Sequence, residues 1–238
     1  MKVSVLTYNL HYHDAFVGVQ NVLSEYKPDV ACFQEMETEE KNFVELEQYG
    51  YKLADYTNSF IRGTKVFCIA TFYRPDKLEM RESESITLPR SFYEVILFLL
   101  RGNHDPRTVL KSDFVLPNQD IISLYNLHLT PLATNSVRVK QLTCTLEDLK
   151  LHNKRNVIIA GDYNYPYGRK KFEILIEKYN LQEATNTINF TFEKRFLGLF
   201  SVKLKDDYIL YKNIKVLETK KIDVSYSDHF PIIASFQV

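Results

Sequence analysis

The chain has 238 residues and a formal net charge of zero, with 30 Lys and Arg against 30 Asp and Glu. This length can bury a substantial core, and we expect one catalytic domain over residues 1–238. The neutral balance excludes the overall cationic field that draws a protein to nucleic acid or anionic membrane, so a polyanion must meet a local patch.

Short apolar runs rich in β-branched residues predict strands. In chain order they lie at residues 3–8, 30–33, 66–73, 95–100, 121–127, 157–160, 208–211 and 232–236. Apolar residues at helical spacing predict helices around 19–26, 43–46 and 139–149, the last capped by Asn135 or Ser136. This mixture predicts an α/β fold in which helices cover sheets. The least regular stretches are 101–119 and 163–171.

Polar side chains follow several of the predicted strands at the point where each strand ends. They are Asn9, Glu35, His128, Asp162 with Asn164, and Asp228 with His229. A single polar residue after a strand is usually a turn former. Strand ends at one edge of a sheet converge, however, so five such places together predict one pocket.

The types of these side chains indicate a chemistry. The oxygen donors are Asn9, Glu35, Asp162, Asn164 and Asp228. Such donors suit Mg²⁺, for which Mn²⁺ can substitute, better than Zn²⁺. His128 and His229 can donate to a phosphoryl oxygen or move a proton near neutral pH. Together they predict Mg²⁺-dependent attack of water on phosphorus.

The N-terminal sequence and the cysteines bear on location. The chain turns polar after six residues, and no later run approaches the roughly 20 apolar residues of a membrane span. Cys32, Cys68 and Cys144 are too few and too scattered for a disulfide framework or a paired zinc site. We expect a soluble intracellular protein, cytoplasmic or also nuclear in a eukaryote, without stable membrane association or an obligate protein partner.

Six short motifs share an order and spacing with a known superfamily. They are TYN at 7–9, FQE at 33–35, NLHLTP at 126–131 with Arg138 and Gln141 after it, GDYN at 161–164, DDYIL at 206–210 and SDHFP at 227–231. The pattern resembles the endonuclease/exonuclease/phosphatase superfamily, which includes pancreatic deoxyribonuclease, abasic-site endonucleases, tyrosyl-DNA phosphodiesterase, neutral sphingomyelinases and inositol polyphosphate 5-phosphatases. The resemblance covers nearly the whole chain and implies a four-layered α/β/β/α sandwich with two mixed β-sheets flanked by helices.

The resemblance also implies a metal site. Glu35 would bind the catalytic metal, with Asn9 and Asp228 completing its surroundings. Asp162 and Asn164 would position the attacking water and the scissile phosphate.

Two histidines have roles implied by the same resemblance. His229 would contact the phosphate or act as base, with Asp207 as its acidic partner and Asp206 as the rival for that position. His128 would donate a hydrogen bond or proton toward the non-bridging or leaving oxygen. Whether Asp162 or the His229–Asp207 pair takes the proton from water stays open. A histidine at 128 is typical of the deoxyribonuclease-like, tyrosyl-DNA and sphingomyelinase branches, whereas abasic-site endonucleases carry tyrosine there.

Two segments bear on the substrate. In 163–171, Tyr165 precedes Arg169 and Lys170, which predicts base stacking and phosphate binding. An equal interpretation is that the tyrosines pack the loop and the cations begin a solvated helix. In 194–205, an apolar cluster with basic flanks would contact substrate or lipid if it is exposed, although we favour a core position for it.

Other polar residues have less motif context. Arg138 and Gln141 lie three residues apart on the predicted helix after His128, so they can brace that loop or form an exposed polar face. We expect the remaining histidines at the surface: His11, His13, His104 and His152.

Three hypotheses for function follow. The first is a nucleic-acid phosphodiesterase, a nuclease or a DNA-end-processing enzyme of tyrosyl-DNA phosphodiesterase type, with nucleic acid as its substrate. The second is a phospholipid phosphodiesterase of sphingomyelinase type or an inositol-phosphate phosphatase. The third is a catalytically silent binding module, against which the complete set of expected site residues argues.

Overall fold

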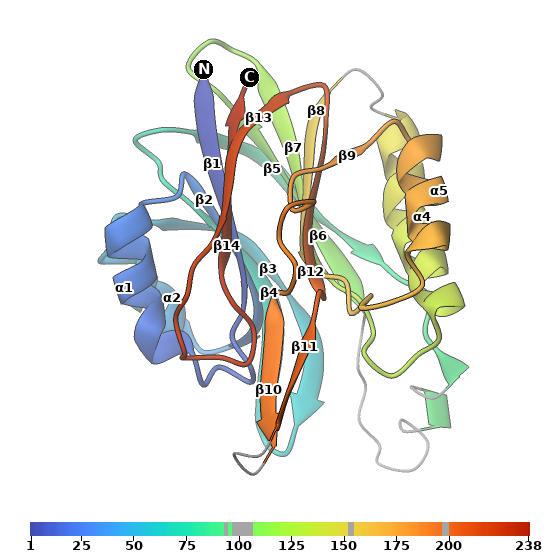
Figure 1. Ribbon diagram of the computed structural model, residues 1–238. Helices are drawn as coiled ribbons and strands as arrows, with labels where there is room; N and C mark the ends of the chain where they lie inside the picture. Colours follow the sequence, from blue (N-terminus) through green and yellow to red (C-terminus); the bar gives the residue numbers. More distant parts are fainter. Residues whose placement is uncertain (93–94, 97–106, 152–154, 197–199) are drawn as a thin grey trace.

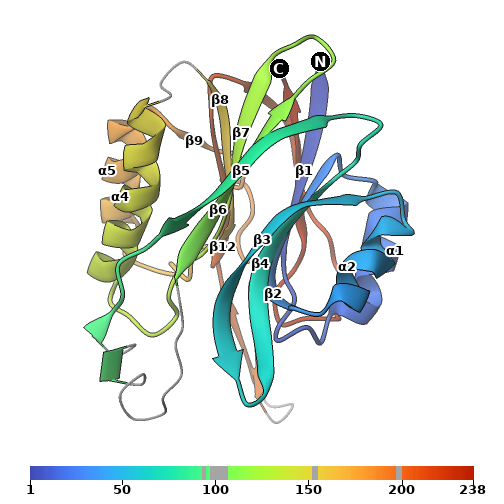
Figure 2. The same cartoon turned by 180° about the vertical axis from the view of Figure 1, so that it is seen from behind.

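Two β-sheets pack face to face, with helices covering both outer sides (Figure 1). The computed structural model describes residues 1–92, 95–96, 107–151, 155–196 and 200–238. Helices α1 (Phe16–Tyr26) and α2 (Glu40–Glu47) cover one sheet, and α4 (Asn135–Leu151) and α5 (Arg169–Lys178) cover the other, as the view from behind also shows (Figure 2). The chain therefore forms the α/β/β/α sandwich that the motifs implied.

The first sheet brings together strands from opposite ends of the described chain. Its order is β13 (Lys215–Lys221), β14 (Ile232–Gln237), β1 (Lys2–Asn9), β2 (Val30–Glu37), β4 (Lys65–Tyr73) and β3 (Lys52–Arg62). Strands β1 and β2 are parallel, and the other neighbours are antiparallel. Strand β14 lies between β1 and β13 and pairs with both, so it joins β13 to the rest of the sheet.

The second sheet has a similar plan. Its order is β5 (Glu79–Thr87), β6 (Thr108–Val115), β7 (Ile121–His128), β8 (Asn156–Asp162), β12 (Asp207–Lys212) and β9 (Gln182–Glu183). Strands β7 and β8 are parallel. A separate hairpin of β10 (Phe192–Phe196) and β11 (Phe200–Leu204) projects from the end of the molecule opposite to both termini (Figure 1).

Three apolar cores explain the layering. Val5 of β1 and Leu124 of β7 belong to the core between the sheets. A second core lies beneath α1 and α2 and a third beneath α4 and α5. The central strands are covered on both faces, which is why they are continuous apolar runs, and each fully buried Val or Leu stabilises the fold by about 1.5–3 kcal/mol. None of the helices in the described ranges is long and apolar enough to cross a membrane.

A buried amide pair crosses the core between the sheets. Gln34 Nε2 on β2 donates to Asn126 Oδ1 on β7 at 2.8 Å. Asn126 Nδ2 in turn donates to the carbonyl oxygen of Ala70 at 2.9 Å. Both amides are fully buried. Because a buried amide is costly unless it is hydrogen-bonded, this pair favours one relative position of the two sheets, next to Glu35 and His128.

The structure confirms seven of the predicted strands and all three predicted helices, and it corrects three expectations. The strand prediction at 95–100 is wrong at residues 95–96, which are helical, and residues 97–100 lie outside the described ranges. The stretch 101–119, predicted to be irregular, contains β6. Asn135 and Ser136 lie inside the first turn of α4, so neither residue precedes that helix as predicted.

Gly161 sets the distance between β7 and β8. Its φ is +147°, and a Cβ atom there would lie 2.0 Å from the carbonyl oxygen of Leu127. We predict that Gly161→Ala lowers the free energy of unfolding by at least ~2 kcal/mol, because strand β8 must move away from β7. Urea denaturation measures this loss. Gly63→Ala is the matched control, since Gly63 also has positive φ but no atom within 4 Å of the added Cβ; equal losses in both variants would contradict the prediction.

Candidate active site

The ends of four central strands meet at the end of the molecule from which the β10–β11 hairpin projects (Figure 1). Strand β1 ends at Asn9, which is opposite Gln34 of β2 in the parallel ladder. Strands β7 and β8 end at His128 and Asp162, which are paired in register. The parallel pairs β1–β2 and β7–β8 therefore bring the predicted site residues of both sheets to one place.

Glu35 lies at a β-bulge. The register of β2 against β4 shifts between Phe33 and Met36, and Glu35 has a φ of +57°. Positive φ costs a non-glycine residue about 1–2 kcal/mol, so the surrounding structure must hold this conformation. The bulge aims the carboxylate at the site, where Oε2 accepts a hydrogen bond from the backbone N–H of Tyr12 at 2.8 Å.

Asn9 joins carboxylates from the two sheets. Its Nδ2 donates to Asp162 Oδ2 at 2.9 Å and to Glu35 Oε1 at 3.3 Å. Its Oδ1 accepts the backbone N–H of His11 at 2.9 Å, which fixes the orientation of the amide. His128 Nε2 lies 3.6 Å from Asp162 Oδ2 and 3.7 Å from Glu35 Oε1. Four of the predicted residues therefore form one compact cluster.

His128 is a neutral imidazole at the centre of this cluster. Burial lowers the pKa of His128 well below its usual value, and the positive charges of Arg107 and His229 lower it further. Nδ1 is buried and has no hydrogen-bond partner in the described part of the chain. The ring therefore carries a single N–H beside two carboxylates.

His229 is held by Asp207. His229 Nδ1 lies 2.8 Å from Asp207 Oδ2, and His229 Nε2 lies 3.8 Å from Asp162 Oδ2. Burial opposes the charged imidazole, but the carboxylates of Asp207 and Asp162 outweigh burial and raise the pKa of His229 well above its usual value. Asp206 makes no such contact, and burial together with the charge of Asp207 raises the pKa of Asp206 to about 6. The geometry thus places Asp207, rather than Asp206, against His229.

Asp162 and Asn164 lie on a tight turn after β8. Asn164 has a φ of +49°, which directs its backbone N–H to Asp162 Oδ1 at 2.8 Å. Its Nδ2 donates to the carbonyl oxygen of Leu129 at 2.9 Å. Burial raises the pKa of Asp162 well above its usual value, and the charges of Asp207 and Asp206 add to the effect. A cation in the cluster would relieve this cost of burying the carboxylate.

Asp228 adjoins the cluster through its neighbours in the chain. Ser227 Oγ donates to the carbonyl oxygen of Asn9 at 2.9 Å and accepts the backbone N–H of His229 at 3.0 Å. Asp228 Oδ1 is buried without a hydrogen-bond partner among the described residues. Asp228 Oδ2 lies 3.6 Å from His11 Nε2. His11, which we expected to be an uninvolved surface residue, therefore borders the site.

Thr191 is a site residue that sequence reasoning missed. Its Oγ1 accepts the backbone N–H groups of Asp206 at 3.0 Å and Asp207 at 2.9 Å. Its carbonyl oxygen accepts the backbone N–H of Phe230 at 2.7 Å. Thr191 thus fixes both the aspartate and the turn that carries His229, and a lone threonine in a polar segment has no local pattern that would reveal this role.

The donor set fits a hard divalent cation. Glu35 and Asp162 both direct a carboxylate oxygen at the side-chain amide of Asn9. Asp228 offers Oδ1, which is buried and has no hydrogen-bond partner among the described residues. Asp162, Asp207 and His229 also place three ligand atoms within 4.8 Å of one another. Because Asp207 and His229 are already hydrogen-bonded to each other, Glu35, Asp162 and Asp228 are the more available ligands.

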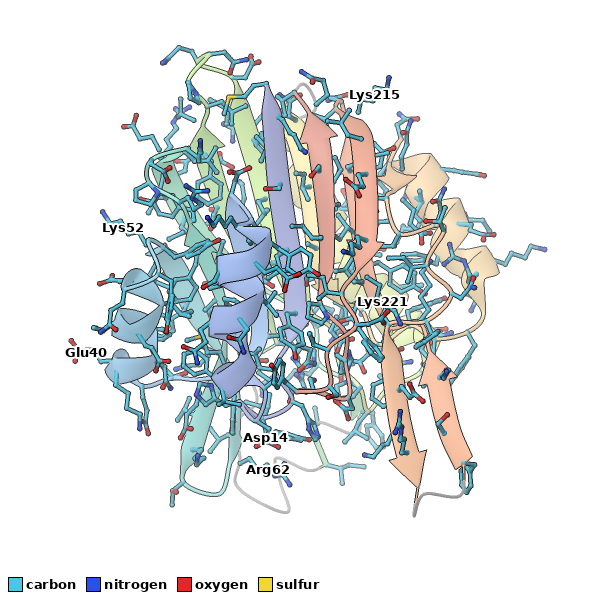
Figure 3. The ribbon with its side chains drawn as sticks, turned by 60° about the vertical axis from the view of Figure 1, so that its left-hand side comes forward. Asp14, Glu40, Lys52, Arg62, Lys215 and Lys221 are labelled. Carbon is cyan, nitrogen blue, oxygen red and sulfur yellow. The ribbon has the colours of Figure 1, made fainter. Side chains whose placement is uncertain are left out.

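An open groove of about 920 Å³ leads away from this cluster. His11 and Asp228 line it together with the β10 segment around Lys194 and the loop from Lys221 to Phe230. Figure 3 shows Lys221 near the base of the hairpin. The groove is large enough to hold the part of a substrate that surrounds a reacting group.

The predicted substrate residues lie away from this groove. Tyr165 is buried and its ring stacks on Phe172 with centroids 5.3 Å apart, so it has no free face on which a base could stack. Arg169 Nη2 donates to Glu183 at 2.5 Å, and Lys170 is exposed in the first turn of α5. The geometry therefore favours the alternative that the tyrosine packs the loop and the cations begin a helix.

The structure also decides the expectations for Arg138 and Gln141, by their hydrogen bonds, and for the 194–205 segment, by exposure. Arg138 donates to the carbonyl oxygens of Thr130 at 3.0 Å and Pro131 at 2.7 Å, and Gln141 Oε1 accepts the backbone N–H of Thr130 at 3.2 Å. These side chains brace the loop after His128 and do not form an exposed face. In the 194–205 segment, the favoured core position is wrong for Phe200, whose side chain is 61% exposed.

A sequence model described as the Endonuclease/Exonuclease/phosphatase family matches residues 6–229. The chain belongs to this family. Its members are hydrolases that act on phosphoester bonds, and they generally depend on a divalent metal. The predicted catalytic and metal residues, from Asn9 to His229, lie within the matched residues.

Sequence relatives cover part of the chain. A UPF0294 protein of Erwinia tasmaniensis is 29% identical over 133 residues, which are 56% of this chain and 47% of the relative. A UPF0294 protein of Vibrio campbellii is 24% identical over 134 residues, 55% of this chain and 45% of the relative. The chain spans about half the length of these relatives.

Solved structures with the same fold cover nearly the whole chain. The human Nocturnin catalytic domain with bound sulfate has a TM-score of 0.77, with 16% identity over 99% of this chain and 94% of that one. The Bacteroides thetaiotaomicron mannosyl-6-phosphatase Bt3783 has a TM-score of 0.72, with 17% identity over 99% of this chain and 100% of that one. D. rerio TDP2 complexed with a single-strand DNA product has a TM-score of 0.72, with 17% identity over 100% of this chain and 99% of that one. At such low identity these likenesses show the fold alone.

Proposed function

We propose that the chain is a Mg²⁺-dependent phosphodiesterase that cleaves nucleic acid, as a nuclease or a DNA-end-processing enzyme. The observation that supports this most directly is the cluster in which Asn9 joins Glu35 and Asp162 between two imidazoles, His128 and His229. Carboxylates for a cation, a neutral imidazole and an aspartate-held imidazole are groups that together can catalyse hydrolysis at phosphorus.

Each side chain has a place in this reaction. Glu35 and Asp228, with Asn9 beside them, would hold the cation, which when bound neutralises charge on the phosphoryl oxygens. Asp162, oriented by the Asn164 N–H, would position the attacking water. Burial raises the pKa of Asp162, which makes it a stronger base than an exposed carboxylate.

The two imidazoles differ in charge and so in task. His128 is neutral and would donate its single N–H toward an oxygen of the scissile phosphate. Asp207 orients the ring of His229 and favours its protonated form, so Nε2 would donate to a second phosphoryl oxygen. Asp162 is therefore the better candidate for the base.

Two observations support nucleic acid as the substrate. The groove walls carry three cations that can meet phosphates, Lys194, Arg195 and Lys221, among four carboxylates. Arg195 lies 3.8 Å from Glu193 and Lys221 lies 2.8 Å from Asp223, so a phosphate would compete with these ion pairs. D. rerio TDP2, with the same fold, has been solved with a single-strand DNA product. Lys170 and Arg169 lie on α5 and would contact only a substrate long enough to reach that helix.

The test is a substrate panel in Mg²⁺. It comprises single- and double-stranded DNA, RNA, 5′-tyrosyl DNA, sphingomyelin vesicles, inositol phosphates and mannose 6-phosphate. We expect hydrolysis of a nucleic acid by the native chain and none by Glu35→Gln purified in parallel, which controls for contaminating nucleases. Hydrolysis of lipid or of a phosphomonoester alone would refute the proposal.

A phospholipid phosphodiesterase is the second candidate, and one observation favours it. The hairpin exposes Phe200 and Val202, 61% and 37% exposed, beside Lys194, Arg195 and Lys203. Apolar side chains with basic neighbours at the rim of a site suit insertion among lipid headgroups, where the basic groups meet the phosphates. In the same panel, this candidate predicts sphingomyelin hydrolysis that Phe200→Ser weakens.

A further inference from the structure

Gly18 allows an aromatic ring to lie directly on helix α1. A Cβ atom on Gly18 would be 2.2, 2.4 and 2.5 Å from three ring atoms of Tyr226. The Tyr226 hydroxyl accepts a hydrogen bond from Asn21 Nδ2, one turn further along α1, at 3.2 Å. Glycine inside a helix is less favourable than alanine by about 0.5–1 kcal/mol, so its use here calls for a reason other than helix stability.

Tyr226 immediately precedes the turn that carries two site residues. Ser227 follows it and bonds the carbonyl oxygen of Asn9, Asp228 comes next, and His229 is the ring held by Asp207. Tyr226 also lines the groove beside Asp228. A shift of the Tyr226 backbone would therefore pass directly to these side chains.

The opposite side of the same turn is fixed by β10. The backbone N–H of Glu193 donates to the carbonyl oxygen of Asp228 at 2.8 Å, and that of Phe230 donates to Thr191 at 2.7 Å. These bonds restrain the turn from the hairpin side. The contact of Tyr226 with Gly18 restrains it from the side of α1.

We propose that Tyr226 is a positioning residue: Gly18 admits its ring onto α1, and this contact places Asp228 to bind the divalent cation. The inference rests on the proposed function and deepens it, because it says that helix α1, which lies outside the site, fixes the position of the metal ligand Asp228. Neither Gly18 nor Tyr226 touches the reacting groups.

The contact can be changed without unfolding the chain. Tyr226 is 39% exposed and belongs to none of the three apolar cores, so truncating it opens no enclosed cavity in a core. The loop keeps other anchors, since Ile222 is buried in the core beneath α1 and Val224 packs against it. Gly18→Ala adds a good helix former to α1. A loss of metal binding can therefore be separated from a loss of stability.

The experiment measures Mn²⁺ affinity by calorimetry and thermal stability without metal. We expect Gly18→Ala and Tyr226→Ala each to weaken Mn²⁺ binding about tenfold, the usual effect of losing a residue that orients a metal ligand. The double variant should bind no more weakly than Tyr226→Ala, because the added methyl group then has no ring to displace. Tyr226→Phe keeps the ring and should bind within about threefold of the native chain.

Val17→Ala is the matched control, since Val17 is the neighbour of Gly18 on α1 and is 68% exposed. Native affinity in both single variants, or additive losses in the double variant, would overturn the inference. A lower melting temperature with unchanged Mn²⁺ affinity would also overturn it, because it would show a structural role only. A native chain that neither binds Mn²⁺ nor hydrolyses any substrate would refute the proposed function itself.

Discussion

Glu35→Gln is expected to lower kcat/KM by roughly 10³-fold, because a bound cation contributes several kcal/mol of transition-state stabilisation and about 1.4 kcal/mol corresponds to tenfold. Glutamine keeps the length of the side chain, and its carbonyl oxygen can still accept the Tyr12 N–H that now bonds Oε2. The substitution therefore removes charge with little change in shape. Removing the metal with EDTA should have at least as large an effect.

The measurement is the rate of hydrolysis over a Mg²⁺ titration, with Mn²⁺ affinity determined separately. Glu40→Gln is the matched control, because Glu40 is exposed in the first turn of α2 and lies at the outer edge of the molecule (Figure 3). We expect native rates for this control. Full turnover of Glu35→Gln, or turnover in EDTA by the native chain, would refute a metal-dependent mechanism.

His229→Gln is expected to lower kcat by about 10³-fold, within the range that a positioned proton donor contributes. Asp207→Asn should cost about 10- to 100-fold, because the ring stays in place while its partner loses the charge that orients and polarises it. Asp206→Asn should cost less than about threefold, since the pKa of Asp206 is already raised to about 6 and the residue has no contact with the ring.

These three variants are compared by single-turnover kinetics at one saturating Mg²⁺ concentration, with melting temperatures to exclude misfolding. The expected order of loss is His229, then Asp207, then Asp206. The 2.8 Å distance from His229 Nδ1 to Asp207 Oδ2 is the basis for assigning Asp207 as the partner of His229. A larger loss in Asp206→Asn than in Asp207→Asn would contradict that assignment.

The strand ends were predictable because each depends on neighbouring residues in the chain. An apolar run followed by a carboxylate, amide or imidazole predicts a polar group at a sheet edge, and the order of the motifs implied a sandwich of two sheets. Asn9, Glu35, His128 and Asp162 accordingly lie together. The bulge at Glu35 was not predictable, since its extra residue is visible only in the register against β4.

The residues that sequence reasoning missed act through distant contacts. Thr191 bonds backbone groups 15 and 16 residues away, and Gly18 meets Tyr226 from the other end of the chain. No local pattern marks either one. Exposed strands such as β5 were missed for a different reason, because seven charged or polar side chains among Glu79–Thr87 hide the apolar period of a strand.

The positions of the tyrosine and of the hairpin could not be decided from the sequence, for a shared reason. An aromatic residue in a polar segment has the same local pattern whether its ring is buried or exposed. Tyr165 is buried because α5 brings Phe172 against it, and Phe200 is exposed because β10 and β11 form a sheet of their own. Both outcomes depend on tertiary packing rather than on the composition of the segment.

The place of β14 between β1 and β13 has a consequence during translation. While the chain is being made, β1 has no neighbour on that side, and the residues that supply it are among the last described ones to leave the ribosome. Asp228 and His229 directly precede β14. We therefore expect a nascent chain to remain without hydrolytic activity until β14 has left the ribosome.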